Sequence, residues 1–573
     1  MKFYTISVII KKILVLEKKM HKKRLLASIL LGAVMLASCK GSDTATDTDI
    51  STEHVHTMQI KKHLPTCTED GSTEHVCTVC NYTFSDNVVK ATGHSFTDGV
   101  CSECGYFEKE IYVDGVKASA VPEKGNYSVY VRGSENDSFH FWDYDSWQVK
   151  NGASAVSVYF YSVKTLYSSF NALKSDAVNL SVGDTVGITS HHEGFGRGGG
   201  IFEINSGYVN CSSVQIAEGK YATLIPFKVG DEKVITVDQF GTKANGVMAD
   251  QTAINTAFVF SNATTVEFES EKYTQKARLQ ISNVHNKTIN GRGAVISNDY
   301  ETGVVNWQDF VINDNSSNIT IKNLIISCDE TEGKNTLFRN NDHVQLYIGN
   351  ASFVTLDNVT VRTPHNTEND RHVTSVWMQE GAHDIVIKNS TILNLSHSTV
   401  GGGIWISNCK NVQIINNHIE KVSHDEVLAV FNGSVDNVLI EENYIHTHDE
   451  PAPQASAHVI GFSVYIESER SYTYTNIVFR NNTLDIVSWK DAFMFGNVDG
   501  VEIYGNKVDL RCNDVAQPIL NAVFRVPDVS TTQKNVSVYD NEITVYNPSE
   551  IPFTESCGEG FDFHDNTLKF VTN

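Results

Sequence analysis

The chain has 573 residues, of which 68 are Asp or Glu and 45 are Lys or Arg, so its formal net charge is −23. This length exceeds one ordinary globular domain. The acidic balance excludes nucleic acid as the expected partner, because a phosphate backbone requires a basic face. A polyanionic glycan remains an option only where a local basic cluster or a bound cation offsets the field, so neutral or weakly charged sugars are the easier ligands.

Residues 1–38 predict a targeting signal that begins late. From Met20 a basic stretch and a short apolar run lead to Leu36-Ala37-Ser38-Cys39. This pattern resembles a bacterial lipoprotein signal, which implies a start at Met20, a lipid on Cys39 and a cell-envelope protein that touches the membrane through this lipid only. A membrane-spanning anchor is the alternative, but the apolar run is too short for it. Residues 39–52, rich in Ser, Thr and Asp, predict a flexible tether.

Residues 53–107 concentrate cysteine and histidine. Five of the 11 cysteines lie here, and four of them form two Cys-x-x-Cys pairs whose spacing is typical of a zinc ribbon. The segment resembles small Cys/His repeats of bacterial surface proteins. We expect a structural Zn²⁺ bound by Cys77 and Cys80 and by some of Cys67, His94, Cys101 and Cys104. Disulfides remain the alternative for an exported chain.

Residues 108–165 predict a small antiparallel β module, because segments such as IYVDGV, YSVYVRG and VSVYFYSV alternate apolar and polar residues. Residues 166–233 follow as a cap segment. They contain a short helical pattern, VKTLYSSFNALKS, and then a strand, a glycine-rich turn and a second strand.

Residues 234–573 carry a repeat with an interval of about 24 to 39 residues. Each copy is an alternating strand, an Asn-rich corner and a second alternating strand. The copies are NITIKNLIIS, FVTLDNVTVR, DIVIKNSTIL, NVQIINNHIE, NVLIEENYIH, NIVFRNNTLD, GVEIYGNKVD, NVSVYDNEIT and GFDFHDNTLK. A third short strand precedes most copies: VQLYIG, SVWMQE, GIWISN, LAVFNG, SVYIES, AFMFGN and AVFRVP.

One copy cannot bury its own apolar face, so the copies must stack. Three strands per copy with tight corners predict an all-β fold, a right-handed parallel β-helix. Stacking also predicts a ladder of corner amides at Asn417, Asn443, Asn482, Asn506, Asn541 and Asn566. An antiparallel sandwich would require Gly-rich two-residue hairpins, which are scarce here.

The start of this region resembles a known superfamily. The segments VGDTV and GRGGGIFEI, followed by 234–258 with Asp250, Thr252, Ala253 and Ile254, resemble the first coil of pectate-lyase-like β-helix proteins. The resemblance covers about residues 180–570 and implies the fold. It does not specify the reaction, because the superfamily includes polygalacturonase-like hydrolases, lyases, phage depolymerases and non-catalytic adhesins.

Alternation in the third strand of each coil predicts a row of outward side chains on one face. Neighbouring strands are about 4.8 Å apart, so the row forms a continuous strip. We expect Tyr347, Trp377, Trp405, Tyr465 and Arg525 to bind sugar rings, with Ala429 leaving a gap beside them. The alternative is that a loop or a neighbouring chain covers the strip.

An acidic cluster lies beside this gap. Residues 423–430, SHDEVLAV, resemble the strand of the polygalacturonase family that carries paired catalytic carboxylates, which places Asp425 and Glu426 at those positions. However, the other acidic motif, at Asp342, is three coils or about 14 Å away. The histidine expected within residues 401–403 is also missing. Polygalacturonase chemistry is therefore not carried over.

The residues around the gap allow two reactions. Asp425 and Glu426 could act as general acid and base on a glycosidic bond, with His424, Lys490 and Asp491 nearby. Alternatively, a His or Lys removes a proton from a uronate while Arg371, or Ca²⁺ held by Asp370, Asp425 and Glu426, neutralises the sugar acid. For a single acid, a solvated corner is the simpler interpretation. We expect a polysaccharide hydrolase or lyase, with a non-catalytic adhesin as the alternative.

Overall fold

A computed structural model of the chain describes residues 57–97, 100–103, 110–132, 141–145, 157–245, 248–298, 308–328, 343–363, 366–422, 426–448, 458–462, 472, 474–488, 491–512, 522–527, 530–546 and 552–571. The predicted signal and tether, with Met20 and Cys39, lie outside these residues. No helix in the described ranges combines the length and apolar character needed to cross a membrane. The chain divides into two units.

The first unit contains an antiparallel sheet of three strands, β1 (Met58–His63), β2 (Gly71–Cys77) and β3 (Thr83–Val89). In the second unit the first described strands are the short antiparallel pair β4 (Phe96–Thr97) and β5 (Val100–Cys101).

The small β module is a five-stranded sheet in the order β7 (Val116–Ala118), β6 (Glu110–Val113), β10 (Ser157–Ser162), β8 (Tyr127–Arg132) and β9 (Phe141–Trp142). Its neighbours are antiparallel except β6 and β10, which run parallel. The module is therefore mixed rather than wholly antiparallel, because two strands far apart in the sequence pair at its centre. Ile111, Val129, Val158 and Phe160 form its own core.

The cap segment forms a second five-stranded sheet: β11 (Thr165–Tyr167), β12 (Thr185–Ser190), β13 (Gly198–Asn205), β15 (Lys220–Ile225) and β14 (Ser213–Ala217). The helices are α3 (Phe170–Ser175), η1 (Ala177–Asn179), η2 (Val237–Phe240) and α4 (Gln251–Val259). The Asp250 carboxylate precedes α4 and accepts hydrogen bonds from the backbone N–H of Lys243 (2.7 Å) and Thr274 (3.1 Å). These bonds hold α4 against the first coil, as its sequence predicts.

Three long sheets form the rest of the second unit. Sheet I has 13 strands: β16 (Phe227–Val229), β17 (Glu232–Thr236), β18 (Thr265–Glu267), β21 (His285–Asn290), β24 (Ser317–Lys322), β27 (Ser352–Asp357), β30 (His383–Lys388), β34 (Lys410–Ile415), β37 (Val435–Glu441), β40 (Tyr474–Arg480), β43 (Val498–Tyr504), β46 (Gln533–Tyr539) and β49 (Phe561–His564).

Sheet II has 11 strands: β19 (Lys272–Gln275), β22 (Val295–Asn298), β25 (Ile325–Cys328), β28 (Thr360–Arg362), β31 (Thr391–Asn394), β35 (His418–Val422), β38 (Tyr444–His448), β41 (Thr483–Ser488), β44 (Lys507–Cys512), β47 (Glu542–Tyr546) and β50 (Thr567–Val571).

Sheet III has 11 strands, of which ten follow one path: β20 (Leu279–Ser282), β23 (Gln308–Asn313), β26 (His343–Gly349), β29 (Asn366–Gln379), β33 (Ile404–Ile406), β36 (Leu428–Val430), β39 (His458–Phe462), β42 (Asp491–Phe495), β45 (Ala522–Arg525) and β48 (Thr554–Glu555). The eleventh strand, β32 (Ser396–Val400), pairs with β29 beside this path.

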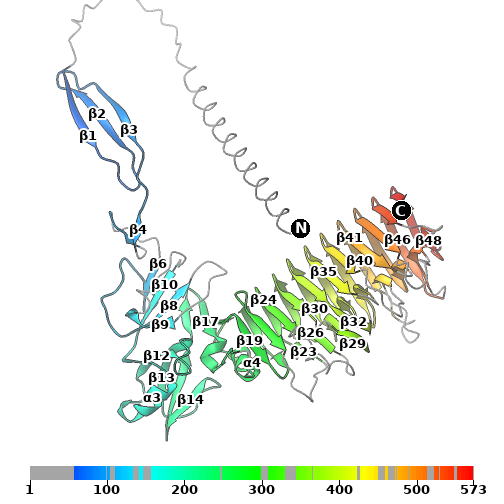
Figure 1. The fold of residues 1–573 in the computed structure, drawn as a ribbon, viewed down its shortest axis with the longest axis horizontal. Helices are drawn as coiled ribbons and strands as arrows, with labels where there is room; N and C mark the ends of the chain where they lie inside the picture. Colours follow the sequence, from blue (N-terminus) through cyan, green and yellow to red (C-terminus); the bar gives the residue numbers. More distant parts are fainter. Residues whose placement is uncertain are drawn as a thin grey trace, which may run out of the picture. The chain divides into compact units, whose positions relative to one another are not determined.

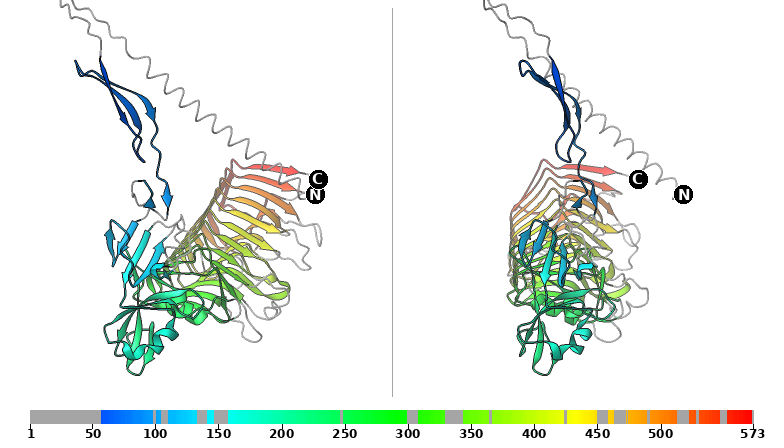
Figure 2. Two further views of the ribbon diagram at one scale, coloured as in Figure 1. Left: turned by 60° about the vertical axis from the view of Figure 1, so that its left-hand side comes forward. Right: turned by 90° about the vertical axis from the view of Figure 1, so that its left-hand side faces the viewer.

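The three sheets are the walls of one solenoid. Each coil contributes a strand to sheet I, then to sheet II, then to sheet III, and successive coils pair in parallel, as β24, β25 and β26 do with β27, β28 and β29. The ribbon views show these strands lying side by side with a common direction (Figures 1 and 2). The chain therefore forms the predicted right-handed parallel β-helix.

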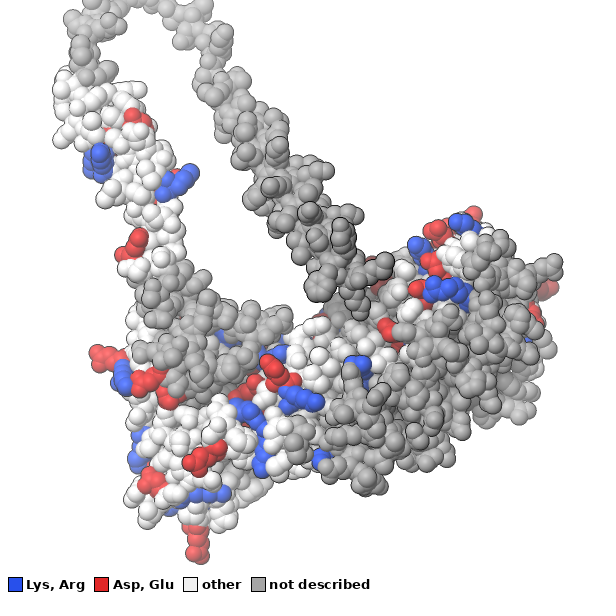
Figure 3. Space-filling model, in the orientation of Figure 1, with Lys and Arg blue, Asp and Glu red and all other residues white. Residues whose placement is uncertain are grey.

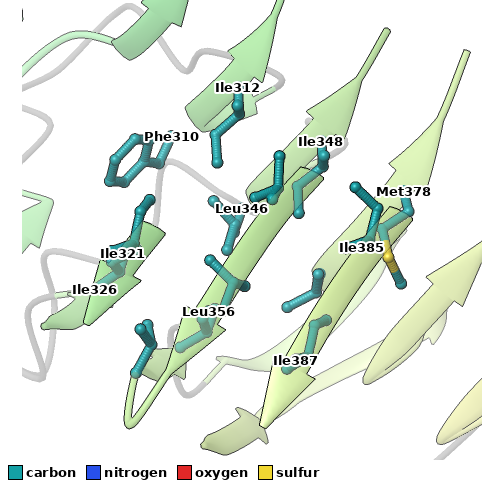
Figure 4. Close-up of a cluster of buried hydrophobic side chains, with 14 of the residues drawn as sticks. Phe310, Ile312, Ile321, Ile326, Leu346, Ile348, Leu356, Met378, Ile385 and Ile387 are labelled. Carbon is teal, nitrogen blue, oxygen red and sulfur yellow. The ribbon is translucent and has the colours of Figure 1, made fainter. Parts of the chain in front are cut away.

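Apolar side chains from all three sheets meet inside the solenoid. Leu346 and Ile348 of β26 stack on Phe310 and Ile312 of β23, and all four are inaccessible to solvent (Figure 4). These residues belong to one continuous core that extends from the cap sheet to the last coils. The coils must stack, because each coil buries the apolar side chains of the coil before it.

The predicted ladder of corner amides is confirmed. In each rung the side-chain N–H of one asparagine donates to the side-chain oxygen of the next, from Asn417 to Asn443 (3.0 Å) and on to Asn566. Each amide also donates to a backbone carbonyl of a neighbouring coil, as Asn443 does to Ile414 (2.8 Å). The ladder therefore satisfies polar groups that the corner would otherwise bury without partners.

Figure 3 shows both acidic and basic side chains among the described residues of the face in view.

Candidate functional site

The predicted strip lies on the outer face of sheet III. Strand register places a row of residues at one level of successive coils: Tyr347, Trp377, Trp405, Ala429, Gly461, Met494 and Arg525. Tyr347, Trp377, Trp405 and Ala429 form a hydrophobic cluster that is separate from the interior core, whereas Leu346 and its equivalents belong to that core. The row therefore faces outward.

One position of the row was predicted wrongly. The strand of that coil is β39, at His458–Phe462, and not the later SVYIES segment. Gly461 therefore occupies the place predicted for Tyr465, and Tyr465 lies outside the described residues. Both segments alternate apolar residues, so the sequence pattern alone could not decide between them.

The prediction that the rings are open to solvent is also wrong. Tyr347, Trp377 and Trp405 are only 3%, 9% and 4% exposed. They pack edge to face, with centroids 6.3 Å apart for the first two rings and 5.4 Å for the two indoles. Phe431 closes the series against Trp405 at 4.8 Å. Ala429 is fully buried, so the predicted gap is not open.

A row of ionisable residues lies beside this cluster. Glu426 and His458 lie two residues before Leu428 and Ile460, which pair with each other, and His458 pairs with Asp491. Glu426, His458 and Asp491 thus occupy equivalent positions on three successive coils. Sequence analysis did not name His458, because the strand of this coil was assigned to the wrong segment.

Asp491 carries a charge partner on the same face. Its Oδ2 lies 3.3 Å from Nη1 of Arg525, and Nε of Arg525 lies 3.2 Å from Oε2 of Glu555. Asp491 is fully buried and the Arg525 side chain is 22% exposed. Arg525 therefore links a buried carboxylate to a partly exposed one, in place of its predicted role on an open sugar platform.

Glu426 is 3% exposed, and its backbone borders the aromatic cluster. A Cβ on Gly402 would lie 2.1 Å from Nε1 of Trp405 and 2.8 Å from the carbonyl oxygen of Glu426. Residues 401–403 lack the histidine of the polygalacturonase motif, and the structure shows a reason for glycine here. Gly402 leaves room for the indole of Trp405 beside Glu426.

Other predicted site residues are not fully placed. His424, Asp425 and Lys490 lie outside the described residues, and Asp370 and Arg371 are described only as backbone within β29. The catalytic roles of these residues and the Ca²⁺ site at Asp370, Asp425 and Glu426 therefore stay predictions.

A second pair of acids, which sequence analysis missed, lies where the cap meets the first coil. Asp238 is fully buried; its carboxyl accepts a hydrogen bond from Tyr273 and lies 3.2 Å from Nε of Arg197. Glu269 accepts from the Gly198 N–H at 3.0 Å. Burial raises the pKa of both carboxyls, and the nearby Asp238 raises the pKa of Glu269 further. These bonds tie the glycine-rich turn to the solenoid, which indicates a structural role.

The predicted zinc ligands are divided between the two units. In the first unit Cys67 and Cys77 are buried and Cys80 is exposed, and in the second unit Cys101 is buried. The Zn²⁺ site therefore stays a prediction. Cys104 lies outside the described residues.

A surface hollow of about 500 Å³ lies in the last coils, lined by Gln533–Ser537 and Glu559–Asp562. It lies on β46 and β49 of sheet I and not on the face that carries Glu426 and Asp491.

Comparisons with solved structures find distant similarities. The chain is similar to PfbA, a surface adhesin of Streptococcus pneumoniae (14% identity, 59% of this chain and 91% of that chain, TM-score 0.40). It is similar to the tailspike protein gp49 of Acinetobacter baumannii bacteriophage Fri1, a capsular polysaccharide depolymerase (12%, 72% and 76%, 0.39). It is also similar to endo-xylogalacturonan hydrolase from Aspergillus tubingensis (15%, 59% and 95%, 0.42).

The TM-scores of these pairs are all below 0.5, so the β-helix of the chain is established by its own strand pairing. No protein-family model matches the sequence, and no curated protein matches it significantly. Similarity at this level concerns the fold only, so the activities of these proteins are not transferred to the chain.

Proposed function

We propose that the chain is an extracellular β-helix protein that binds and cleaves a polysaccharide on the outer face of sheet III. The observation that carries this proposal is that Glu426 and Asp491 occupy equivalent positions of sheet III, two coils apart. Two coils correspond to about 10 Å between backbones, and side chains can reduce this to the roughly 6.5–9.5 Å that separates the acid and base of inverting glycosidases.

The surroundings suggest which carboxyl plays which role. The Arg525 guanidinium compensates a negative charge on Asp491, so Asp491 is the base that activates a water. Glu426 is 3% exposed and its backbone borders the aromatic cluster, and we assign it the role of general acid. Glu426 protonates the leaving glycosidic oxygen while the Asp491-activated water attacks the anomeric carbon from the opposite face.

A lyase would use the same face differently. His458, which lies between the two acids in register, or Lys490 would remove the C5 proton of a uronate. Arg371, Arg525 or a bound Ca²⁺ would neutralise the sugar acid. Elimination yields an unsaturated uronate with a new ultraviolet absorbance, whereas hydrolysis yields reducing ends without it.

A non-catalytic adhesin or glycan-binding protein is the second candidate. The burial of Glu426, Asp491 and the aromatic cluster favours it, because carboxyls with so little exposed surface are shielded from a substrate.

The experiment incubates the protein, from residue 40 onward, with plant, algal and host glycans. Wild type, E426Q, D491N and the double variant are compared, with E502Q on the outer face of sheet I as the matched control. We expect E426Q and D491N each to lose about 100-fold or more in rate, and E502Q to match wild type. Unchanged turnover in the double variant would place the chemistry elsewhere, and turnover of no glycan by wild type would favour the adhesin.

The remaining proposals concern the N-terminal segments. The two Cys-x-x-Cys pairs support a structural Zn²⁺ bound by Cys77 and Cys80 and by some of Cys67, His94, Cys101 and Cys104. Metal analysis of wild type and C101S tests this, because loss of bound zinc in the variant is expected and zinc-free wild type would favour disulfides. A lipid on Cys39 and a place in the bacterial cell envelope complete the proposal; mass spectrometry of the membrane-extracted protein tests both.

A further inference from the structure

One corner of the solenoid repeats a left-handed residue coil after coil. At this corner of sheet I the backbone φ is positive at one equivalent position of nine successive strands, from β21 to β46. The residues are Asn286, Asn318, Phe353, Asp384, Asn411, Asn437, Asn476, Gly500 and Asn535, with φ of 53°, 54°, 53°, 56°, 54°, 59°, 56°, 81° and 51°. Asn, Asp and Gly tolerate this conformation. Phe353 is the exception, and its bulky side chain makes the position unfavourable.

Phe353 also interrupts a ladder of side-chain hydrogen bonds. Below it the amide of Asn318 donates to Oδ1 of Asn286 (2.7 Å), and above it the amide of Asn411 donates to Oδ1 of Asp384 (2.9 Å). A phenyl ring can neither donate nor accept such a bond. The chain therefore carries backbone strain and a missing rung at one place, and strain of this kind is a reason to look for a function.

The phenyl ring is presented to solvent. Phe353 is 58% exposed and is the one exposed large hydrophobic side chain among the described residues of sheet I. The ring of His383 on the next coil approaches it at 5.9 Å and 78°, an edge contact. His383 in turn donates from Nδ1 to Oδ2 of Asp384 (2.7 Å), and this hydrogen bond holds the pKa of Asp384 below its ordinary value.

Polar groups surround the ring. Ser352 precedes it, and Asn318, His383 and Asp384 occupy the corner on the adjacent coils. Protein-binding hot spots are centred in apolar patches, and no such patch of exposed large side chains surrounds Phe353 on the described part of sheet I. An isolated aromatic face rimmed by hydroxyl, amide, imidazole and carboxylate groups suits a sugar ring, whose C–H face stacks on the aromatic ring while its hydroxyls bond to the rim.

We propose that Phe353, with Ser352, His383 and Asp384, forms a second glycan-binding site on the corner of sheet I, separate from the face of sheet III. The inference rests on the proposed function for its ligand class, a polysaccharide. The corner site holds the polymer and takes no part in bond cleavage.

The test separates binding from folding, because one substitution should raise thermal stability and weaken glycan binding. In F353N an amide would adopt the left-handed conformation readily and could donate to Oδ1 of Asn318, so thermal stability should rise by roughly 2 °C. Loss of the ring should weaken polysaccharide binding about tenfold. F353W keeps an aromatic face and should bind as wild type does. Y208N removes an exposed tyrosine of the cap, 66% exposed, and is the matched control.

Binding is measured by affinity electrophoresis of the folded protein in gels that contain xyloglucan, galactomannan, arabinogalactan or polygalacturonate, and stability is measured by thermal unfolding. Retardation that F353N loses while Y208N and F353W retain it supports the site. Equal retardation of F353N and wild type overturns the corner site alone, because cleavage lost in E426Q and D491N would still stand. Absence of retardation of wild type in every gel overturns the corner site together with glycan binding.

Discussion

The indole of Trp405 lies over Gly402, so closely that a Cβ on this glycine would lie 2.1 Å from the indole nitrogen. The same Cβ would approach the backbone of Glu426 at 2.8 Å. Gly402 therefore couples the aromatic cluster on the outer face of sheet III to the first acid of the proposed site.

Substitution G402A should displace Trp405 and the backbone of Glu426 together. Because neither the rigid indole nor the paired strand can yield cheaply, we expect a loss of about 1–3 kcal/mol in stability and lower activity. Near-ultraviolet circular dichroism and tryptophan fluorescence report the displacement. The control G381A alters a corner glycine with open space around its Cβ, although its φ of 82° adds strain. An unchanged tryptophan spectrum in G402A would contradict the contact.

Trp377 should behave as a core residue and not as a sugar platform. It is 9% exposed, and its Nε1 donates to Oγ of the buried Ser407 at 3.0 Å. We expect W377A to lose about 3–5 kcal/mol of unfolding free energy, measured by denaturant unfolding. Y444A, which truncates a ring on sheet II that is 38% exposed, should change it by well under half as much. A stable W377A that merely binds glycan less would restore the open-strip interpretation.

The buried amide ladder should contribute far more to the free energy of unfolding than the exposed ladder at the corner of sheet I. Asn443 is 1% exposed and bonds to Asn417, Asn482 and the carbonyl of Ile414. N443A leaves these groups without partners, so we expect a loss of about 2–3 kcal/mol. The exposed Asn411 belongs to the outer ladder, and N411A should cost about 0.5 kcal/mol. Equal losses would show that burial of the rung is unimportant.

Glu267 should make stability depend on pH. Burial raises its pKa to about 7, against the opposing charge of Arg292, whose Nη1 lies 3.8 Å from Oε2. The folded state therefore keeps a proton that the unfolded state releases between its ordinary value of 4.5 and about 7. Stability is full below this range and falls as pH rises through it, by on the order of 3 kcal/mol.

Thermal unfolding at about pH 5 and about pH 8 measures this effect. E267Q mimics the protonated form and should reduce the difference between the two conditions by the contribution of Glu267. E502Q, at an exposed glutamate of sheet I, should retain the full difference. A pH dependence in E267Q equal to that of wild type would contradict the raised pKa of Glu267.

Some features of the outer face were predictable from the sequence and others were not. Alternation fixes which side of a strand a residue faces, so Tyr347, Trp377 and Trp405 were placed in one outward row. Alternation says nothing of what lies over that row, so the burial of these rings was missed. It also could not choose between two alternating segments in one coil, which is why His458 and Gly461 were missed and Tyr465 was named.

The sequence alone determined the solenoid, because a repeated pattern of apolar residues and corner asparagines leaves one way to bury every coil, and the ladder from Asn417 to Asn566 followed from the same repeat. Only the tertiary structure decided which side chains meet across coils. Glu426 and Asp491 are 65 residues apart in number, yet share one level of sheet III, and Phe353 stands out only against the left-handed residues stacked above and below it. Such relations depend on strand register between coils of unequal length, which a linear pattern does not specify.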